Sequence, residues 1–202
     1  MALSRLNQPY FTMFLLRSST APARVDRIES SLNHTYTVTR KSLLSRDLSL
    51  KPGLITQPSY SLKRKTTHKI YYQVEQNCTG CKEGITLSAK RRAFRRTVPL
   101  KSESLHLCTE LQKISIFSSK YSFVWNAETY IWKRNEYGNL NIHCICPRTE
   151  SILAEFCWKA SIVPQIKEIG ELRMFGNAVS DLKFQSVLVT AFFVTLDTLL
   201  EL

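Results

Sequence analysis

Short segments in which apolar and polar residues alternate run through much of the chain. The pattern is clearest at Tyr121, Phe123 and Trp125, which occupy every second position before a turn at residues 126–128. A period of two puts such side chains on one face of a β-strand. Similar strand patterns occur at Tyr36 and Val38, in 70–74, from Ile85, at Ile114 and Ile116, at Tyr130 and Trp132, along 140–146, along 152–158, and at Leu172 and Met174. The pattern predicts an antiparallel meander with one aromatic-rich face.

Residues 43–65 do not show a comparable alternating run. Pro52, Gly53 and Pro58 fall inside this segment, and both residue types interrupt regular secondary structure. We therefore expect a loop with little regular structure here.

The most apolar segment is the end of the chain, where no charged residue occurs from Phe184 to Leu196. A membrane helix, a buried strand, a strand running into a helix, or a buried helix that is apolar on all sides would each suit such a segment. The uncharged run is shorter than the about 20 residues that cross a bilayer. Asp197 and Glu201 fall inside any window that is long enough to span, and carboxylates are costly in a membrane. The length also exceeds that of most strands, so we expect a buried helix, with the tail anchor as an alternative.

The two patterns fit one architecture. A meander with one apolar face must cover that face, and closing the sheet into a barrel removes its edge strands. A large barrel leaves a lumen that must be filled, and a helix that is apolar on all sides fills it. The sequence thus predicts a mainly β fold, an antiparallel β-barrel-like sheet around a hydrophobic C-terminal helix, over residues 31–202.

Residues 1–30 differ in composition from the rest of the chain. Arg5, Arg17, Arg24 and Arg27 are basic, hydroxyl side chains are frequent, and the first acidic residue is Asp26. This composition resembles a mitochondrial transit peptide, and a short apolar run also resembles part of a signal peptide. We expect a flexible basic leader, with a targeting segment as the alternative.

Three short segments resemble a known family. They are YIWK at 130–133, ILAEF at 152–156 and VLVTAFFV at 187–194. These segments resemble the tubby C-terminal-like superfamily, in particular small fungal proteins of that fold, over roughly residues 110–200. The resemblance implies a closed β-barrel around a hydrophobic C-terminal helix. The superfamily includes tubby proteins, which bind phosphoinositide headgroups through Lys and Arg, and phospholipid scramblases and plant defence-related proteins. The tubby ligand positions do not match residue by residue here, so the resemblance assigns no site.

The chain has a formal net charge of +12, and such a field attracts phosphates on lipids, nucleic acids or soluble ligands. Its densest basic run comprises Lys90, Arg91, Arg92, Arg95 and Arg96. Arginine can bind phosphate through forked hydrogen bonds, and lysine contributes a point charge. We predict an anionic-ligand site at this run, with a solvated rim as the alternative.

Further basic residues at 63–65 and 133–134 are candidate additions to this site. Only Phe94 is interleaved with the run, and RNA recognition generally uses several stacking aromatic residues. The pattern therefore argues against nucleic acid as the partner.

The chain contains six cysteines, which we expect to be free thiols. Cys78 and Cys81 form a Cys-x-x-Cys pair, but a zinc site needs further ligands. The nearest candidates, His143, Cys144 and Cys146 or else His106 and Cys108, do not form a second pair with that spacing. A hairpin turn with two ordinary cysteines is the simpler expectation, so we predict no metal.

No pattern typical of an enzyme active site or a cofactor occurs in the sequence. The sequence therefore predicts a non-enzymatic binding module for a phosphoinositide or another anionic ligand. We expect a cytoplasmic protein with peripheral contact to anionic phospholipid headgroups, and a mitochondrial location is the alternative. A scramblase-like or tail-anchored membrane protein and a structural or interaction domain are the competing functions.

Overall fold

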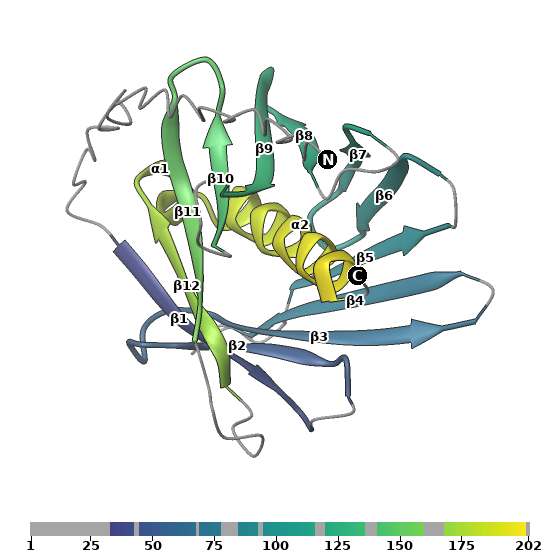
Figure 1. Cartoon of the computed structure of the whole chain (residues 1–202), viewed down its shortest axis with the longest axis horizontal. Coiled ribbons are helices and arrows are strands. Elements are labelled where there is room, and N and C mark those ends of the chain that lie inside the picture. Colours follow the sequence, from purple (N-terminus) through teal and green to yellow (C-terminus); the bar gives the residue numbers. More distant parts are fainter. Residues whose placement is uncertain are drawn as a thin grey trace, which may run out of the picture.

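The strands form a closed antiparallel barrel (Figure 1). The computed structural model describes residues 33–42, 45–67, 69–77, 85–92, 95–115, 120–135, 141–159 and 168–200. The strands are β1 (Asn33–Arg40), β2 (Leu48–Pro52), β3 (Ser59–Thr66), β4 (Ile70–Asn77), β5 (Ile85–Arg91), β6 (Thr97–Ser102), β7 (Leu107–Lys113), β8 (Tyr121–Trp125), β9 (Glu128–Arg134), β10 (Ile142–Cys146), β11 (Ser151–Trp158) and β12 (Glu168–Phe175). Each strand pairs with its neighbours in the chain, and β1 also pairs with β12 to close the sheet. The predicted meander and its closure into a barrel are confirmed.

Helix α2 (Leu182–Leu200) lies inside the ring of strands (Figure 1). Every residue from Phe184 to Thr198 is buried. The Phe192 ring lies 5.4 Å from the ring centre of Trp132 and 5.2 Å from that of Phe156, so the helix packs against the barrel wall. The predicted buried helix is confirmed, and the alternative of a strand is wrong. A helix surrounded by sheet is apolar on all sides because it has no solvent face.

The entry into α2 is fixed by local hydrogen bonds. A short helix, α1 (Asn177–Ser180), precedes it, and Asp181 separates the two helices. The Asp181 carboxylate accepts hydrogen bonds from the backbone N–H groups of Lys183 and Phe184. Aspartate is a favoured N-cap, and its charge also suits the positive end of the helix dipole.

Helix α2 is also long and apolar enough to cross a membrane. Most of it is buried inside the protein, and the core helix of a soluble protein passes the same test of length and hydropathy. The helix therefore carries little weight as a sign of membrane insertion.

The expected loop over residues 43–65 is wrong, because β2 and most of β3 lie there. Leu48 and Leu50 are buried and alternate with more exposed residues, as in a strand with one face toward the lumen. Pro52 is the last residue of β2, and Pro58 directly precedes β3. The prolines and the glycine thus mark a hairpin connection between two strands.

Strands β6 and β7 were not predicted from the sequence. β6 contains Pro99, and only Leu111 of β7 is fully buried, so neither strand shows a long apolar alternation. Ile114, where we expected a strand, lies one residue beyond β7 and is exposed. Ile116, the other residue of that predicted strand, lies outside the described residues. The expected leader (residues 1–30) and the turn at Cys78 and Cys81 lie outside the described residues.

Candidate anion-binding site

The basic residues of β3 and β5 alternate between the two faces of the barrel wall. On β3, Lys63 and Lys65 face outward, and Arg64 between them reaches the C-terminal part of α2. On β5, Lys90 lines the outer surface and Arg91 contacts α2. Successive strand residues point to opposite faces of a sheet, so each basic run divides between an outer and an inner site.

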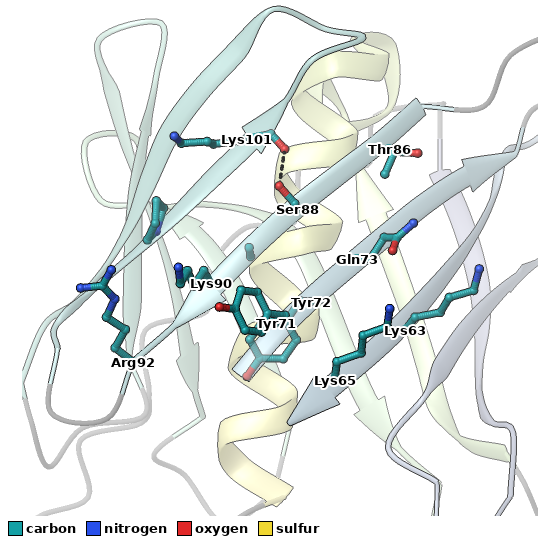
Figure 2. A pocket seen from close by; sticks show the side chains of 12 residues that line it. Lys63, Lys65, Tyr71, Tyr72, Gln73, Thr86, Ser88, Lys90, Arg92 and Lys101 are labelled. Carbon is teal, nitrogen blue, oxygen red and sulfur yellow. Dashed lines mark hydrogen bonds between the residues drawn. The ribbon is translucent and has the colours of Figure 1, made fainter. Parts of the chain in front are cut away.

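The outer site is a groove of about 590 Å³ over β3 to β6 (Figure 2). We call it the basic groove. Its volume falls within the range of about 300–1,000 Å³ that is typical of small-molecule sites. The groove is lined by Lys63, Lys65, Tyr71, Tyr72, Gln73, Thr86, Ser88, Ala89, Lys90, Arg92, Pro99 and Lys101.

Two cross-strand rows of side chains define the basic groove. In the first row, Lys65 and Lys90 pair with Tyr71 from either side, and the Lys90 ammonium lies 5.2 Å from the centre of the Tyr71 ring. In the second row, Lys63 and Lys101 lie at the ends, with the neutral side chains of Gln73 and Ser88 between them. Both rows thus place cations at the sides and neutral groups in the middle, as Figure 2 shows.

The basic groove contains more positive than negative side chains. Glu75, at the edge of the groove, pairs with Lys63 at 2.9 Å, and this hydrogen bond lowers the pKa of the Glu75 carboxyl. No acidic side chain lines the groove itself among the described residues. Within the part of the chain that the structure describes, Lys65, Lys90 and Lys101 form no ion pair. The groove therefore carries a positive field toward solvent.

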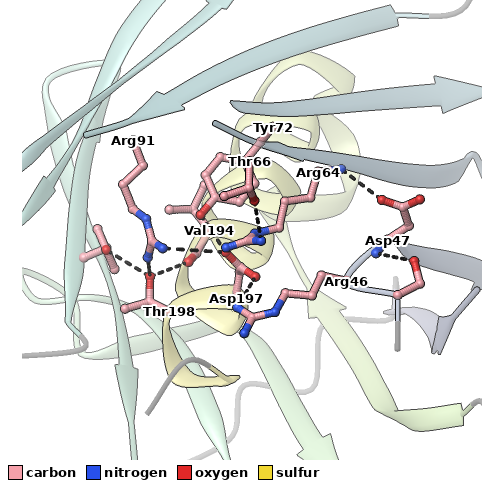
Figure 3. A network of polar contacts seen from close by, with 11 residues as sticks. Arg46, Asp47, Arg64, Thr66, Tyr72, Arg91, Val194, Asp197 and Thr198 are labelled. Atoms are coloured by element: carbon pink, nitrogen blue, oxygen red, sulfur yellow. Dashed lines mark hydrogen bonds and ion pairs between the residues drawn. The ribbon is translucent and has the colours of Figure 1, made fainter. Parts of the chain in front are cut away.

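The inner site is built around Asp197, near the C-terminal end of α2 (Figure 3). Its buried carboxylate accepts hydrogen bonds from Tyr72 at 2.7 Å and from Arg64 at 2.9 Å. The guanidinium groups of Arg46 and Arg91 lie 3.6 and 3.8 Å away. An acidic residue near the negative end of a helix dipole is unfavourable by itself, so the barrel wall supplies the compensating charge.

Thr198 extends this inner site to strand β8. Its hydroxyl accepts a hydrogen bond from Arg91 at 2.6 Å and lies 3.1 Å from the hydroxyl of Tyr121 on β8. We call Arg46, Arg64, Tyr72, Arg91, Tyr121, Asp197 and Thr198 the inner cluster. The cluster joins the end of α2 to β3, β4, β5 and β8 and to the segment before β2.

The predicted basic run is divided by the structure. Lys90 and Arg92 line the basic groove, whereas Arg91 belongs to the inner cluster. Arg95 and Arg96 are exposed and do not line the groove. Phe94 lies outside the described residues.

The additional basic residues are also divided. Lys63 and Lys65 line the basic groove, but Lys133 and Arg134 on β9 do not. Lys101 and Tyr71 line the groove and were missed, because only the strand register brings them beside Lys90.

Cysteine and histidine residues assemble no metal site in the described part of the chain. Cys144 is buried and its neighbour His143 lies beside Glu155, with 3.3 Å between Nε2 and Oε1. His143 and Glu155 are directly opposite each other on β10 and β11. No short spacing along the chain connects this pair, because the two residues meet only across a hairpin.

No protein-family model, curated protein or solved structure matches the chain. The resemblance to the tubby C-terminal-like superfamily therefore stays a prediction.

Proposed function

We propose that the protein is a non-enzymatic binding module that takes a phosphate-bearing ligand in the basic groove. The observation that carries this proposal is the arrangement of Lys65 and Lys90 on either side of Tyr71, with no acidic side chain lining the described groove. A phosphate monoester carries about −1.5 to −2 charges at neutral pH. It would be attracted by the lysines, and Arg92 offers a planar fork for two of its oxygens.

The neutral floor of the basic groove supports a ligand that also has hydroxyl groups. Gln73 and Ser88 lie between the cations of the second row; the Gln73 amide donates to Glu75, and the Ser88 hydroxyl donates to the backbone carbonyl of Lys101. Both side-chain oxygens can accept hydrogen bonds from a ligand, and the Gln73 amide has a second N–H group to donate. A phosphorylated polyol matches these features, whether it is the headgroup of a phosphoinositide or a soluble inositol phosphate. On this proposal the protein is cytoplasmic and contacts membranes peripherally.

The burial of α2 supports this proposal over a tail-anchored or scramblase-like protein. Withdrawing the helix from the barrel would expose the apolar lumen and leave the arginines around Asp197 without this carboxylate. Recovery of the full chain in buffer without detergent would agree with a buried helix, whereas dependence on detergent would favour the membrane alternative.

Vesicle flotation tests the proposal and separates its two ligand sources. The full chain is mixed with phosphatidylcholine vesicles, with vesicles that also contain phosphatidylserine, and with vesicles that also contain a phosphoinositide. We expect flotation with the phosphoinositide vesicles and its loss when soluble inositol hexakisphosphate is added. Binding of inositol hexakisphosphate without flotation would assign a soluble ligand. Equal recovery on neutral and anionic vesicles, together with no binding of the soluble probe, would refute the proposal.

Two matched variants locate the site. Lys65→Gln/Lys90→Gln removes two charges from the basic groove, and Arg95→Gln/Arg96→Gln removes two charges outside it. Each cation near an anionic surface contributes about 1 kcal/mol, so the groove variant should bind about thirtyfold more weakly. The control variant should lose less, because Arg95 and Arg96 are exposed and do not line the groove. The opposite ranking would move the site to the exposed arginines.

A further inference from the structure

The inner cluster and the basic groove are built on the same stretches of strand. Arg64 of the inner cluster lies between Lys63 and Lys65 of the groove, and Arg91 lies between Lys90 and Arg92. Figures 2 and 3 show the two faces of this wall. The contacts of Arg64 and Arg91 with α2 are therefore made from the same stretches of backbone that carry groove cations on both sides.

In the described part of the chain, the end of β5 contacts the inner cluster where its pairing with β6 has already stopped. Within the described residues, β5 pairs with β6 only at Ser88 and Ala89, although β5 continues to Arg91. Pro99 of β6 lines the groove beside this opening, and proline has no N–H group for a ladder hydrogen bond. Lys90 and Arg91 are thus held by pairing with β4 on one side and by the contact of Arg91 with α2 on the inner face.

We propose that Asp197 and Thr198 are positioning residues for the basic groove, so that ligand binding in the groove and docking of the last turns of α2 stabilise each other. This inference rests on the proposed function. Asp197 contacts β3, β4 and β5 through Arg64, Tyr72 and Arg91. These strands carry the whole first row of the groove and all of the second row except Lys101, which lies on β6. Coupling between two sites is reciprocal, so an effect of α2 on the groove requires an equal effect of ligand on α2.

A neutral substitution separates positioning from charge. Thr198→Val keeps the side-chain shape and the net charge, but it removes the hydroxyl that accepts from Arg91. Thr195→Val is the matched control, since Thr195 is also buried and its hydroxyl bonds only to the carbonyl of Ala191 in its own helix. Neither residue lines the basic groove.

The experiment measures binding of inositol hexakisphosphate by calorimetry to the wild-type chain and to both variants, after circular dichroism has confirmed that each is folded. We expect Thr198→Val to bind about fivefold more weakly, within the usual range of coupling between sites, and Thr195→Val to bind within about twofold of wild type. Equal affinities for all three chains would overturn the inference while leaving the proposed function intact.

Hydrogen exchange gives a second readout that a merely stabilising role would not change. With the wild-type chain, inositol hexakisphosphate should slow amide exchange in the last turns of α2, from Thr195 to Leu200, and the effect should shrink in Thr198→Val. Binding without added protection there would overturn the inference alone. If the wild-type chain binds neither inositol hexakisphosphate nor phosphoinositide vesicles, the proposed function fails and the inference fails with it.

Discussion

The Asp197 carboxylate should be among the polar groups on which the stability of the barrel depends most. Its side chain is only 2% exposed, and it accepts hydrogen bonds from Tyr72 and Arg64 at 2.7 and 2.9 Å. Asp197→Asn keeps the size of the side chain but removes its charge. The guanidinium groups of Arg64 and Arg91 would then remain largely buried, with exposed fractions of 11% and 13%, beside a neutral amide.

The expected loss is about 3 kcal/mol in the free energy of unfolding. Removing one partner of a buried ion pair costs about 3–5 kcal/mol because the other charge is left uncompensated. The asparagine oxygen can still accept one hydrogen bond, which places the estimate of about 3 kcal/mol at the lower end of that range. Domains of this kind have total stabilities of about 5–15 kcal/mol, so the variant should still fold.

Equilibrium unfolding in urea measures this loss. Glu171→Gln is the control, since Glu171 forms an ion pair with Arg173 in which both side chains are exposed by 40% or more. An exposed pair contributes about 0–1 kcal/mol. A loss for Asp197→Asn that does not exceed that of Glu171→Gln would refute the assignment of the inner cluster as a stabilising contact.

Three further substitutions test other parts of the fold. A Cβ atom at Gly170 would lie 2.4 Å from the carbonyl oxygen of Cys157. Gly170→Ala should therefore lower the free energy of unfolding, measured in urea, by about 1–3 kcal/mol. Wild-type stability of this variant would contradict the close approach. Phe192→Ala should lose about 3–5 kcal/mol in the same assay, because it empties the lumen at a fully buried aromatic ring; a loss below about 1 kcal/mol would place the ring outside the core. Burial lowers the pKa of His34, whose Nδ1 accepts a hydrogen bond from Gln185. The unfolded chain then binds the proton more readily, so the contribution of His34 is complete above about pH 6.5 and declines as the pH falls below that value. The difference in melting temperature between wild type and His34→Gln should therefore change across this window, and a constant difference would contradict the assignment.

The sequence pattern predicts the barrel best where the wall is most aromatic. Tyr121, Phe123, Tyr130 and Trp132 alternate strictly because their side chains fill the lumen against α2. The predicted turn between these strands is a two-residue connection at Asn126 and Ala127, with Glu128 already in β9. The prediction is weaker where the wall is less apolar, as in β6 and β7, or where proline ends a strand, as in β2.

The candidate site could be predicted only in part, because its geometry depends on pairing between distant strands. The sequence identifies a basic run around Lys90. Because side chains alternate along β5, however, the Arg91 side chain points into the barrel and contacts α2. From the sequence alone, Asp197 could be used only to argue against a membrane-spanning helix. Its partners Arg64 and Tyr72 are more than 100 residues away in the chain, with separations of 133 and 125, and no local pattern connects them.

The central claim, that the basic groove holds a phosphate-bearing ligand, is tested most directly by mapping the bound ligand on the assigned amide NMR spectrum. Inositol hexakisphosphate is titrated into the full chain at physiological salt. We predict saturable shifts that centre on Lys65, Tyr71 and Lys90 and extend to the end of α2. Shifts that centre on Arg95 and Arg96, or the absence of any saturable shift, would contradict the account.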